Sequence, residues 1–432
     1  MKRKRGTALA LSVLAVLLLF FGAALTRRMP TEVVWLPIQT PALTPAPTPA
    51  PTPVPTPEPT PTPRAALDYE AEELSASLAV SIEGQSDVAR LTDADYNTKL
   101  TLPEGTAITL WAESEISALY MIWDRAPAPW FVYAEEFVAG YGEQGFLHEF
   151  AELPEGTQSL KIQLPQGGVL CDIYAFTDGR LPEEVQLWES PVERADILLF
   201  PTHGDDELLF FGPIMPIYAG ERGLSVQVAY LTNHRNEPYR QHEQLNGLWT
   251  VGVTAYPVFG RLDDYKFDSL QDALYYYGQD VAIEFQVEMI RRFRPQVIVD
   301  HAESGEYGHG VHQMNTFCMK KAVEYAADEN YDGGSLATYG VWNTPKLYLH
   351  ALRTNNISLD YDRPLERFGG RSAFEMAEEG YAQHLSQHRW SFVVYPKGHA
   401  YDCSSFGLYR STVGEDLEKN DLMENLTPYA EP

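Results

Sequence analysis

Proline recurs at almost every second position between Pro41 and Pro63, and this segment divides the chain into unlike parts. Eleven of the 31 prolines fall within these 23 residues. Each proline lacks a backbone N–H and has a fixed φ, so the segment favours polyproline II over a helix or a sheet ladder. At about 3.1 Å per residue it would reach roughly 70 Å. We interpret residues 29–65 as a disordered but semi-rigid Pro/Thr-rich linker.

An uncharged run precedes this linker. Residues 6–26 would measure roughly 31 Å as a helix, which matches a hydrocarbon core of about 30 Å. The basic flank Met1–Arg5 should stay cytoplasmic. A cleaved signal peptide remains an alternative, but the length of the run favours an anchor. Residues 1–28 are therefore predicted to be a transmembrane helix with the membrane as partner. The body is expected outside the cell, either anchored or, after cleavage, secreted.

The charge of the chain limits its partners. The formal net charge is −28, and no acidic residue precedes Glu32, so the part after the basic flank is more acidic still. Phosphate backbones would repel such a body, which excludes nucleic acid as a partner. Hydrophobic residues make up 44% of the chain and supply ample material for a core. Three cysteines are too few for a disulfide framework, and we expect no bridge.

Residues 66–190 show short alternating segments separated by turn residues. Strands are expected at 107–111, 118–123, 159–163 and 169–174, with Pro and Gly between them. The pattern predicts an all-β sandwich or jelly-roll domain.

An acidic turn in this domain places oxygen side chains at alternate positions, Asp93, Asp95 and Asn97, as calcium ligands could be placed. With the late strand near 171–174, the turn resembles the discoidin-like (galactose-binding-like) β-sandwiches. That resemblance implies a Ca²⁺ site in the β-sandwich, and either carbohydrate binding or packing against the next domain. An ordinary Asp/Asn-rich turn is the alternative.

Strands and helices alternate in residues 191–432. Buried-type strands are expected at 196–200, 225–231 and 296–300, and helices at 206–220, 238–251, 281–292 and 310–327. Such βαβ alternation predicts an α/β domain with a Rossmann-like, mostly parallel sheet covered by helices. Ligands of such sheets bind beyond the carboxyl ends of the strands, so the residues after Phe200 and Asp300 are the first candidates.

Two segments at these strand ends carry the candidate chemistry. Residues 203–207 read His-Gly-Asp-Asp-Glu, and residues 307–312 read Tyr-Gly-His-Gly-Val-His. Hydrolytic zinc usually has three protein ligands and one open position for water. His203 and Asp206 can converge on one ion, and His312 can supply the third ligand.

The neighbouring carboxylate, Asp205, could then take a proton from the metal-bound water. For the first segment alone, capping of a helix by acidic residues is an equal alternative, and Glu207 suits a structural role of that kind.

At these segments the chain resembles the PIG-L/LmbE-like family of zinc-dependent N-acetylglucosamine de-N-acetylases. Residues 202–207 resemble the family's Ala-His-Pro-Asp-Asp-Glu, and residues 307–312 its Tyr-Gly-His-Pro-Asp-His. The resemblance covers about 195–425 and implies a zinc cofactor, with another divalent metal as the alternative. It implies the metal ligands His203, Asp206 and His312, the general base Asp205, a carbonyl-polarising Tyr307, a general acid or electrostatic partner His309, a substrate-binding Arg240 in Arg240-x-x-Glu243, and a substrate-hydroxyl ligand Asp263 or Asp264.

Two positions depart from the family pattern. Gly204 stands where the family has proline, which loosens the turn but removes no chemistry. Val311 stands where the family has an aspartate thought to tune the neighbouring histidine. Glu303 or Glu306 could replace that partner of His309.

The expected function is zinc-dependent hydrolysis of the acetamido group of an N-acetylglucosamine-containing glycan or glycoconjugate, outside the membrane. One alternative is a metal-dependent amidase of the same fold acting on another amide. A second is a non-catalytic cell-surface glycan-binding protein.

Overall fold

The computed structural model describes residues 67–429, and all of them belong to a single unit of the chain. The predicted anchor, residues 1–28, and the predicted linker, residues 29–65, lie outside the described residues. Within residues 67–429, no helix has both the length and the apolar character needed to cross a membrane.

The N-terminal part of the described chain forms one seven-stranded antiparallel sheet of order β2-β7-β3-β6-β4-β5, with β1 also paired to β3. Its strands are β1 Ala79–Ile82, β2 Leu100–Leu102, β3 Thr106–Trp123, β4 Trp130–Tyr133, β5 Val138–Tyr141, β6 His148–Leu164 and β7 Gly168–Phe176. Two strands predicted separately, 107–111 and 118–123, belong to the single strand β3. Register shifts between Trp111 and Ala118 interrupt the pairing of β3 with β6 and explain the break in the pattern.

Hydrogen bonds within the turn already engage the side chains of the acidic turn. Asp93 Oδ1 accepts from the N–H of Asp95 at 3.1 Å, and Asp95 Oδ1 accepts from the N–H of Asn97 at 3.0 Å. The Oδ1 of Asp172 accepts from the N–H of Ala94 in this turn at 3.1 Å. Burial of Asp172, together with the charges of Asp93 and Asp95, raises its pKa to about 7. These bonds are those of an Asx-type turn, and the Ca²⁺ site stays a prediction.

A six-stranded sheet of order β14-β15-β13-β12-β8-β9 organises the C-terminal part. Its strands are β8 Ile197–Leu199, β9 Val226–Val228, β12 Val297–Asp300, β13 Lys346–His350, β14 Asn356–Ser358 and β15 Ser405–Ser411. Strands β13, β12, β8 and β9 are parallel, and β15 and β14 add an antiparallel edge. A separate parallel pair joins β10, Thr232–Asn233, to β11, Leu262–Asp263. The predicted mixed α/β architecture is confirmed.

Three of the four predicted helices follow the predicted ranges. The α-helices are α2 Asp206–Leu209, α3 Pro238–Thr250, α4 Leu270–Tyr277, α5 Gln279–Phe293, α6 Gly310–Ala326, α7 Leu336–Tyr339 and α8 Ala373–Tyr381. Of these, α4, α7 and α8 were not predicted. The helix predicted at 206–220 is wrong in its length, because α2 ends at Leu209 and a π-helical turn, Pro216–Glu221, follows. Pro213 and Pro216 have no N–H to continue the hydrogen-bond ladder.

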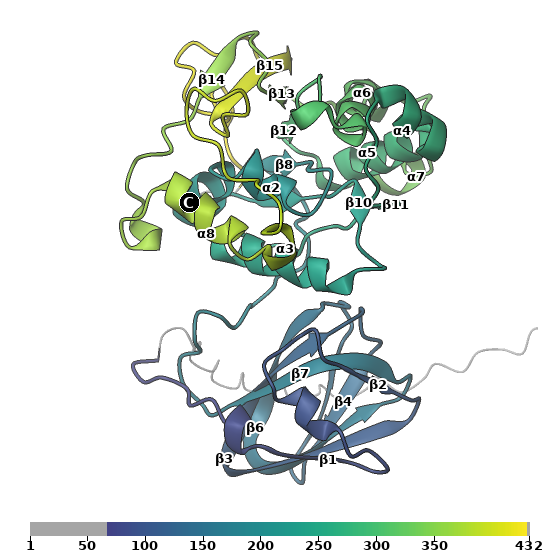
Figure 1. Ribbon diagram of the computed structural model, residues 1–432, viewed down its shortest axis with the longest axis vertical. Helices are drawn as coiled ribbons and strands as arrows, with labels where there is room; N and C mark the ends of the chain where they lie inside the picture. The colour runs from purple at the N-terminus through teal and green to yellow at the C-terminus, as the bar shows by residue number, and fades with distance from the viewer. Residues whose placement is uncertain (1–66, 430–432) are drawn as a thin grey trace, which may run out of the picture. The chain divides into compact units, whose positions relative to one another are not determined.

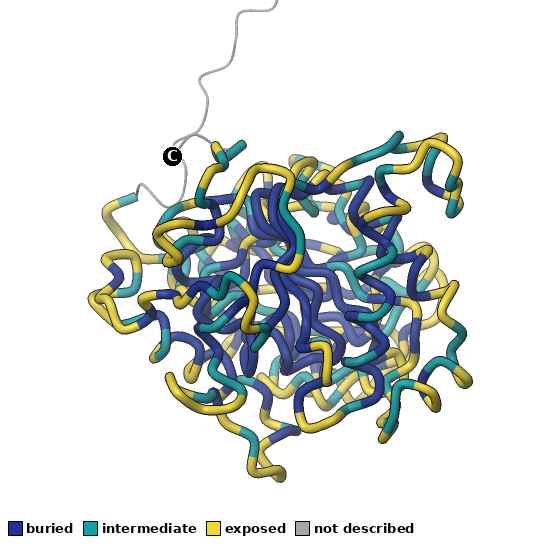
Figure 2. Tube along the Cα trace, turned by 90° about the horizontal axis from the view of Figure 1, so that it is seen from above, coloured by how far each residue is buried: buried dark blue, intermediate teal, exposed yellow. Residues whose placement is uncertain are grey.

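Helices cover both faces of the six-stranded sheet. In Figure 1, α4, α5 and α6 gather on one side of β8 and β12, and α2, α3 and α8 on the other. Successive residues of β8 enter different cores: Leu198 packs with Ile290 and Val323, and Leu199 packs with Leu245. Figure 2 shows buried residues concentrated in the interior of the described chain and exposed residues mainly at its periphery. Burial on both faces explains why the strands read as continuous apolar runs.

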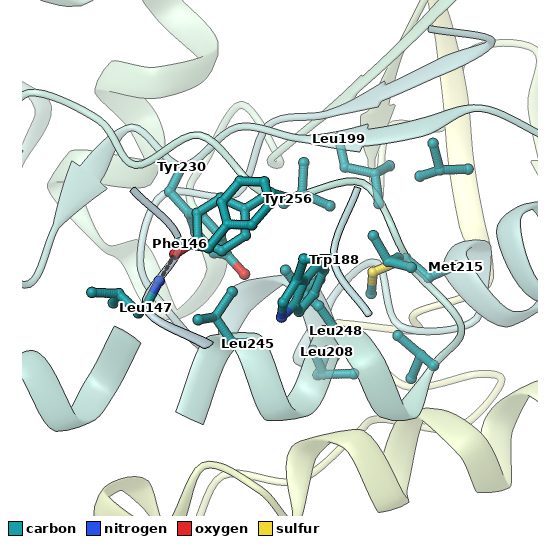
Figure 3. Close-up of a cluster of buried hydrophobic side chains, with 14 of the residues drawn as sticks. Phe146, Leu147, Trp188, Leu199, Leu208, Met215, Tyr230, Leu245, Leu248 and Tyr256 are labelled. Carbon is teal, nitrogen blue, oxygen red and sulfur yellow. Dashed lines mark hydrogen bonds between the residues drawn. The ribbon is translucent and has the colours of Figure 1, made fainter. Parts of the chain in front are cut away.

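A cluster of buried aromatic and aliphatic side chains joins the loop before β6 to the α/β part (Figure 3). The rings of Phe146 and Tyr256 stack with centroids 4.3 Å apart. The hydroxyl of Tyr256 accepts from the backbone N–H of Leu147 at 3.0 Å, and both residues are buried. This hydroxyl therefore satisfies a backbone donor that has no access to water.

Tyr256→Phe should lower the free energy of unfolding by about 1–3 kcal/mol, because it leaves the N–H of Leu147 buried without an acceptor. Urea unfolding of the full chain measures the change. Tyr275→Phe is the matched control, since Tyr275 is 92% exposed, and it should change stability by less than about 0.5 kcal/mol. Equal effects of the two substitutions would contradict the role of the buried hydroxyl.

Candidate metal centre

The two candidate segments meet at the carboxyl ends of neighbouring parallel strands. Leu199 in β8 pairs with Val299 in β12, so the chain leaves both strands at the same edge of the sheet. The first segment leads into α2, and the second passes a 3-10 turn at Glu306–Gly308 into α6. The ring centroids of His203 and His312 are 5.0 Å apart as a result.

The three predicted metal ligands form a small triangle of donor atoms, which we call the donor triangle. The Nδ1 of His203 lies 3.0 Å from the Nε2 of His312 and 3.2 Å from the Oδ2 of Asp206. The Nε2 of His312 lies 3.3 Å from the same Oδ2. Two ligands bound to one zinc ion at about 2.0–2.1 Å in a tetrahedral arrangement are roughly 3.3 Å apart. The donor triangle fits three corners of such a tetrahedron and leaves the fourth for water.

His312 is held between two carboxylates. Its Nδ1 lies 2.9 Å from the Oε2 of Glu306, and its Nε2 faces Asp206. Burial lowers the pKa of His312, but Asp206 and Glu306 outweigh burial and raise it to about 10. Two carboxylates thus surround this histidine with negative charge, which suits the binding of a divalent cation.

Binding of zinc should release about one proton from His312 at pH 6, because a metal ligand must be deprotonated and this histidine titrates near pH 10. Zinc affinity should consequently rise with pH, by about tenfold per unit below the pKa of His312. Calorimetric titration of the full chain in two buffers of different ionisation enthalpy counts the protons. At pH 6 a zinc-bound water, with a pKa of about 7, contributes little to that count. A net release of zero would contradict a protonated His312.

His301 also lies close to the donor triangle, in a possible metal-binding group with Asp206 and His312. Its Nε2 accepts from the N–H of Thr202 at 3.0 Å, and its Nδ1 faces the Oε2 of Glu306 at 2.8 Å. Both nitrogens of His301 are therefore engaged with the protein, so the geometry favours His203 as the second histidine ligand.

His309 precedes α6, and its Nδ1 accepts from the N–H of Val311 at 3.3 Å. Its proton therefore lies on Nε2. Burial, together with His203 and His312, lowers the pKa of His309 to about 2. A neutral His309 can donate a hydrogen bond from Nε2, but it is a poor proton source at neutral pH. The lowered pKa therefore favours the second of the two roles that the resemblance implies, the electrostatic partner.

The pKa values of the adjacent carboxyl groups of Asp205 and Asp206 are shifted in opposite directions. Burial raises the pKa of Asp205 above its usual range, the charge of Arg240 opposes this rise, and that of Asp206 adds to it. Burial also acts to raise the pKa of Asp206, but the surrounding histidines outweigh it and hold that pKa well below its usual range. Asp206 is thus suited to bind a cation, and Asp205 is suited to accept a proton.

Arg240, on α3, joins this centre to a third acid. Its Nη1 donates to the Oδ2 of Asp264 at 2.9 Å, and its Nη2 donates to the carbonyl of Gly204 at 2.5 Å and lies 3.7 Å from the Oδ1 of Asp205. The Oδ1 of Asp264 in turn lies 3.4 Å from the Nε2 of His203. Arg240 and Asp264 therefore line the candidate centre, as substrate ligands would.

Asp263, in contrast, does not point at the centre. It is exposed on β11, and its carbonyl accepts from the hydroxyl of Tyr277 at 2.6 Å. Successive residues of an extended strand point to opposite sides, so only one of the two adjacent acids can face Arg240. Of the two acids left open by the sequence, the geometry therefore favours Asp264 over Asp263 as the candidate substrate ligand.

Tyr307 occupies a left-handed backbone conformation at the rim of the centre, with φ of 56°. Its N–H donates to the hydroxyl of Tyr401 at 3.0 Å, and its ring centroid lies 5.7 Å from that of Phe210. Burial, with a further contribution from Tyr395, raises the pKa of the Tyr307 phenol. The residue is 39% exposed, and its phenol stays protonated at neutral pH.

The structure explains the departure at Gly204. Its N–H donates to the Nε2 of His234 at 3.3 Å, and a Cβ at this position would lie 2.5 Å from the side chain of Gln244. A proline would lose this hydrogen bond and meet Gln244, so the neighbouring residues here require glycine.

Val311 has apolar surroundings, which would not suit the aspartate that the family has at this position. Val311 is fully buried in the apolar core between α5 and α6. Glu303 pairs with Lys320 at 2.6 Å, and Glu306 contacts other histidines. Among the described residues, neither glutamate makes a hydrogen bond to His309, so the suggestion that one of them replaces the aspartate is not supported.

Glu207 and Glu243 point away from the donor triangle. The Oε1 of Glu207 lies 2.8 Å from the Nε2 of His384, and both side chains are fully buried. Glu243 accepts from the N–H and the hydroxyl of Ser386 at 2.7 and 2.6 Å. Both acids therefore tie α2 and α3 to the segment after α8, which is a structural role.

Sequence reasoning assigned no role at the centre to two buried histidines, His301 and His350, and did not predict that Glu306 contacts both of them. His301 directly follows β12, and His350 is the last residue of β13. Polar residues at the carboxyl ends of buried parallel strands were the signal that could have found both histidines.

The chain is similar in sequence to several curated deacetylases. No family model matches the chain. Among curated proteins, the 1D-myo-inositol 2-acetamido-2-deoxy-alpha-D-glucopyranoside deacetylase 1 of Catenulispora acidiphila is 27% identical over 215 residues, which cover 44% of this chain and 65% of the relative. The enzyme of the same name from Frankia casuarinae is 29% identical over 195 residues, which cover 39% and 62%. These two curated relatives of the chain are deacetylases. They are amide hydrolases of N-acetylglucosamine-type substrates, and the chain spans less than two thirds of the length of either.

One solved structure among those similar to the chain is the N,N'-diacetylchitobiose deacetylase of Pyrococcus horikoshii in complex with an inhibitor. It is 15% identical, with a TM-score of 0.35, and the match covers 48% of this chain and 73% of that one. A likeness at this level says nothing about the chemistry of the centre.

Proposed function

We propose that the chain is a zinc-dependent deacetylase that removes the acetyl group from an N-acetylglucosamine-containing glycan or glycoconjugate, outside the membrane. The observation that carries the proposal is the donor triangle of His203, Asp206 and His312, with the proton-accepting Asp205 beside it. The substrates named for the curated relatives support the substrate class. The location rests on the predicted anchor alone.

The residues around the donor triangle have complementary roles in amide hydrolysis. Bound zinc would lower the pKa of a water molecule and polarise the acetamide carbonyl. Asp205 accepts a proton from the attacking water, a role that its raised pKa suits. Tyr307 donates a hydrogen bond to the carbonyl oxygen as negative charge develops there. Arg240 and Asp264 hold the sugar beside these groups.

The leaving amine also needs a proton. His309 has a pKa near 2 and cannot supply one at neutral pH, although its Nε2–H can orient the departing nitrogen. Asp205, once protonated, has the raised pKa of a competent acid. We therefore assign the return of the proton to Asp205 and leave His309 an orienting, electrostatic role.

The test is incubation of the full chain with zinc and N-acetylglucosamine-containing saccharides, including one linked to inositol. Acetate and primary amine should appear in equal amounts. Acetate from a non-sugar amide alone would favour the amidase alternative. Retention of glycan without any release of acetate would favour a non-catalytic binding protein and reject the proposal.

A further inference from the structure

Glu306 takes no direct part in the proposed reaction. It lies at the centre of a buried cluster of three histidines, one of which is the proposed ligand His312. Its Oε2 lies 2.8 Å from the Nδ1 of His301 and 2.9 Å from the Nδ1 of His312. Its Oε1 lies 2.6 Å from the Nδ1 of His350 and accepts from the N–H of Ala302 at 3.0 Å. Four hydrogen bonds therefore converge on one fully buried carboxylate.

The proton positions in this cluster follow from its partners. A carboxylate only accepts, so each of the three histidines carries a proton on Nδ1. In His301 this leaves Nε2 free to accept from Thr202, as observed. In His312 it leaves Nε2, which faces the Nδ1 of His203 and the Oδ2 of Asp206, as the nitrogen that would give up its proton to bind a metal ion. Glu306 thus determines which nitrogen of His312 faces the donor triangle.

His350 balances the charge of Glu306. Its Nε2 lies 3.1 Å from the carbonyl oxygen of Asp402, which also can only accept. Both nitrogens of His350 therefore donate, and the ring carries a positive charge beside Glu306 in a fully buried pair. A buried carboxylate that is paired and fully hydrogen-bonded keeps its charge, so it remains an acceptor for His312.

We propose that Glu306, balanced by His350, is a positioning residue for the metal, which fixes His312 with its proton on Nδ1 and its Nε2 towards the donor triangle. The role rests on the proposed metal-dependent function and deepens it. In metalloproteins, loss of a carboxylate that orients a histidine ligand typically costs about 10–100-fold in metal affinity.

Glu306→Gln tests the role directly. The glutamine amide places N–H donors where one oxygen accepted, so at least one histidine must give up its Nδ1 proton. The zinc dissociation constant of the full chain, measured by competition with a chromophoric chelator, should rise about 10–100-fold. The ¹⁵N shifts of the imidazole rings should show His312 in a different tautomer. Glu303→Gln is the matched control, because Glu303 lies three residues earlier, is exposed, and pairs only with Lys320 among the described residues.

A folded Glu306→Gln chain with wild-type zinc affinity would overturn the role of Glu306 and leave the proposed function intact. A wild-type chain that binds no zinc would instead remove the proposed function. If Glu306→Gln shows no cooperative melting, His350→Gln replaces it, since that variant keeps Glu306 and every ligand and removes one charge. It should weaken zinc about tenfold, and unchanged affinity would overturn the role.

Discussion

Asp205→Asn should lower kcat by about 10²–10⁴-fold while the chain still binds zinc. Asparagine has nearly the same size as aspartate and is equally favoured at the N-cap position before α2. It cannot, however, accept a proton from water at any accessible pH. Asp205 is absent from the donor triangle, and its Oδ1 lies 3.7 Å from the Nη2 of Arg240. Loss of turnover with retained zinc therefore isolates the proton-transfer role from metal binding. Acetate release and metal content, measured on the same preparation, give both quantities.

Asp263→Asn is the matched control for this experiment, because Asp263 is an exposed acid adjacent to Asp264 that does not face the centre. It should leave kcat within about twofold of wild type, since exposed substitutions away from a site have small effects. A decrease as large as that of Asp205→Asn would restore Asp263 as a substrate ligand and contradict the assignment to Asp264.

The pH profile gives a second readout of Asp205. Its raised pKa keeps the carboxyl protonated to a higher pH than an ordinary aspartate, so kcat should fall on the acidic side well above pH 4. The residual activity of Asp205→Asn should lack that limb. A wild-type profile that stays flat down to pH 4 would show that Asp205 is not the group that accepts the proton.

Sequence alone located the centre because its main ligands follow a local rule. His203 and Asp206 come directly after a buried strand, and parallel pairing of β8 with β12 brings His312 to them. Both the strand pattern and the histidine spacing are visible in the printed sequence. The prediction therefore needed only the general rule that ligands bind beyond the carboxyl ends of parallel strands, and not the packing of individual side chains.

The positions of the surrounding residues depend on tertiary packing, which no local sequence pattern encodes. His350 reaches Glu306 from β13, 44 residues later in the chain, and only the assembled sheet brings them together. The choice between Asp263 and Asp264 depended on which face of a two-residue strand turns towards Arg240.

Asp206→Ala should abolish zinc binding and lower turnover at least about 10³-fold. The Oδ2 of Asp206 is one corner of the donor triangle, and the N–H of His203 donates to it at 2.7 Å, so the substitution removes a ligand and frees its neighbour. The stabilisation that a metal ion gives to developing charge is worth several kcal/mol, which corresponds to about 10³-fold in rate. Chelation of the wild-type chain should give the same loss, and added zinc should restore only the wild type.

A comparison of His203→Ala with His301→Gln decides which histidine completes the ligand set. His203→Ala should behave like Asp206→Ala, because it removes a corner of the donor triangle. His301→Gln should weaken zinc by no more than about 10–100-fold, since both nitrogens of His301 are engaged by Glu306 and Thr202. The reverse order of effects would make His301 the ligand. In that case the N–H of Thr202 would have to find another acceptor when the metal binds.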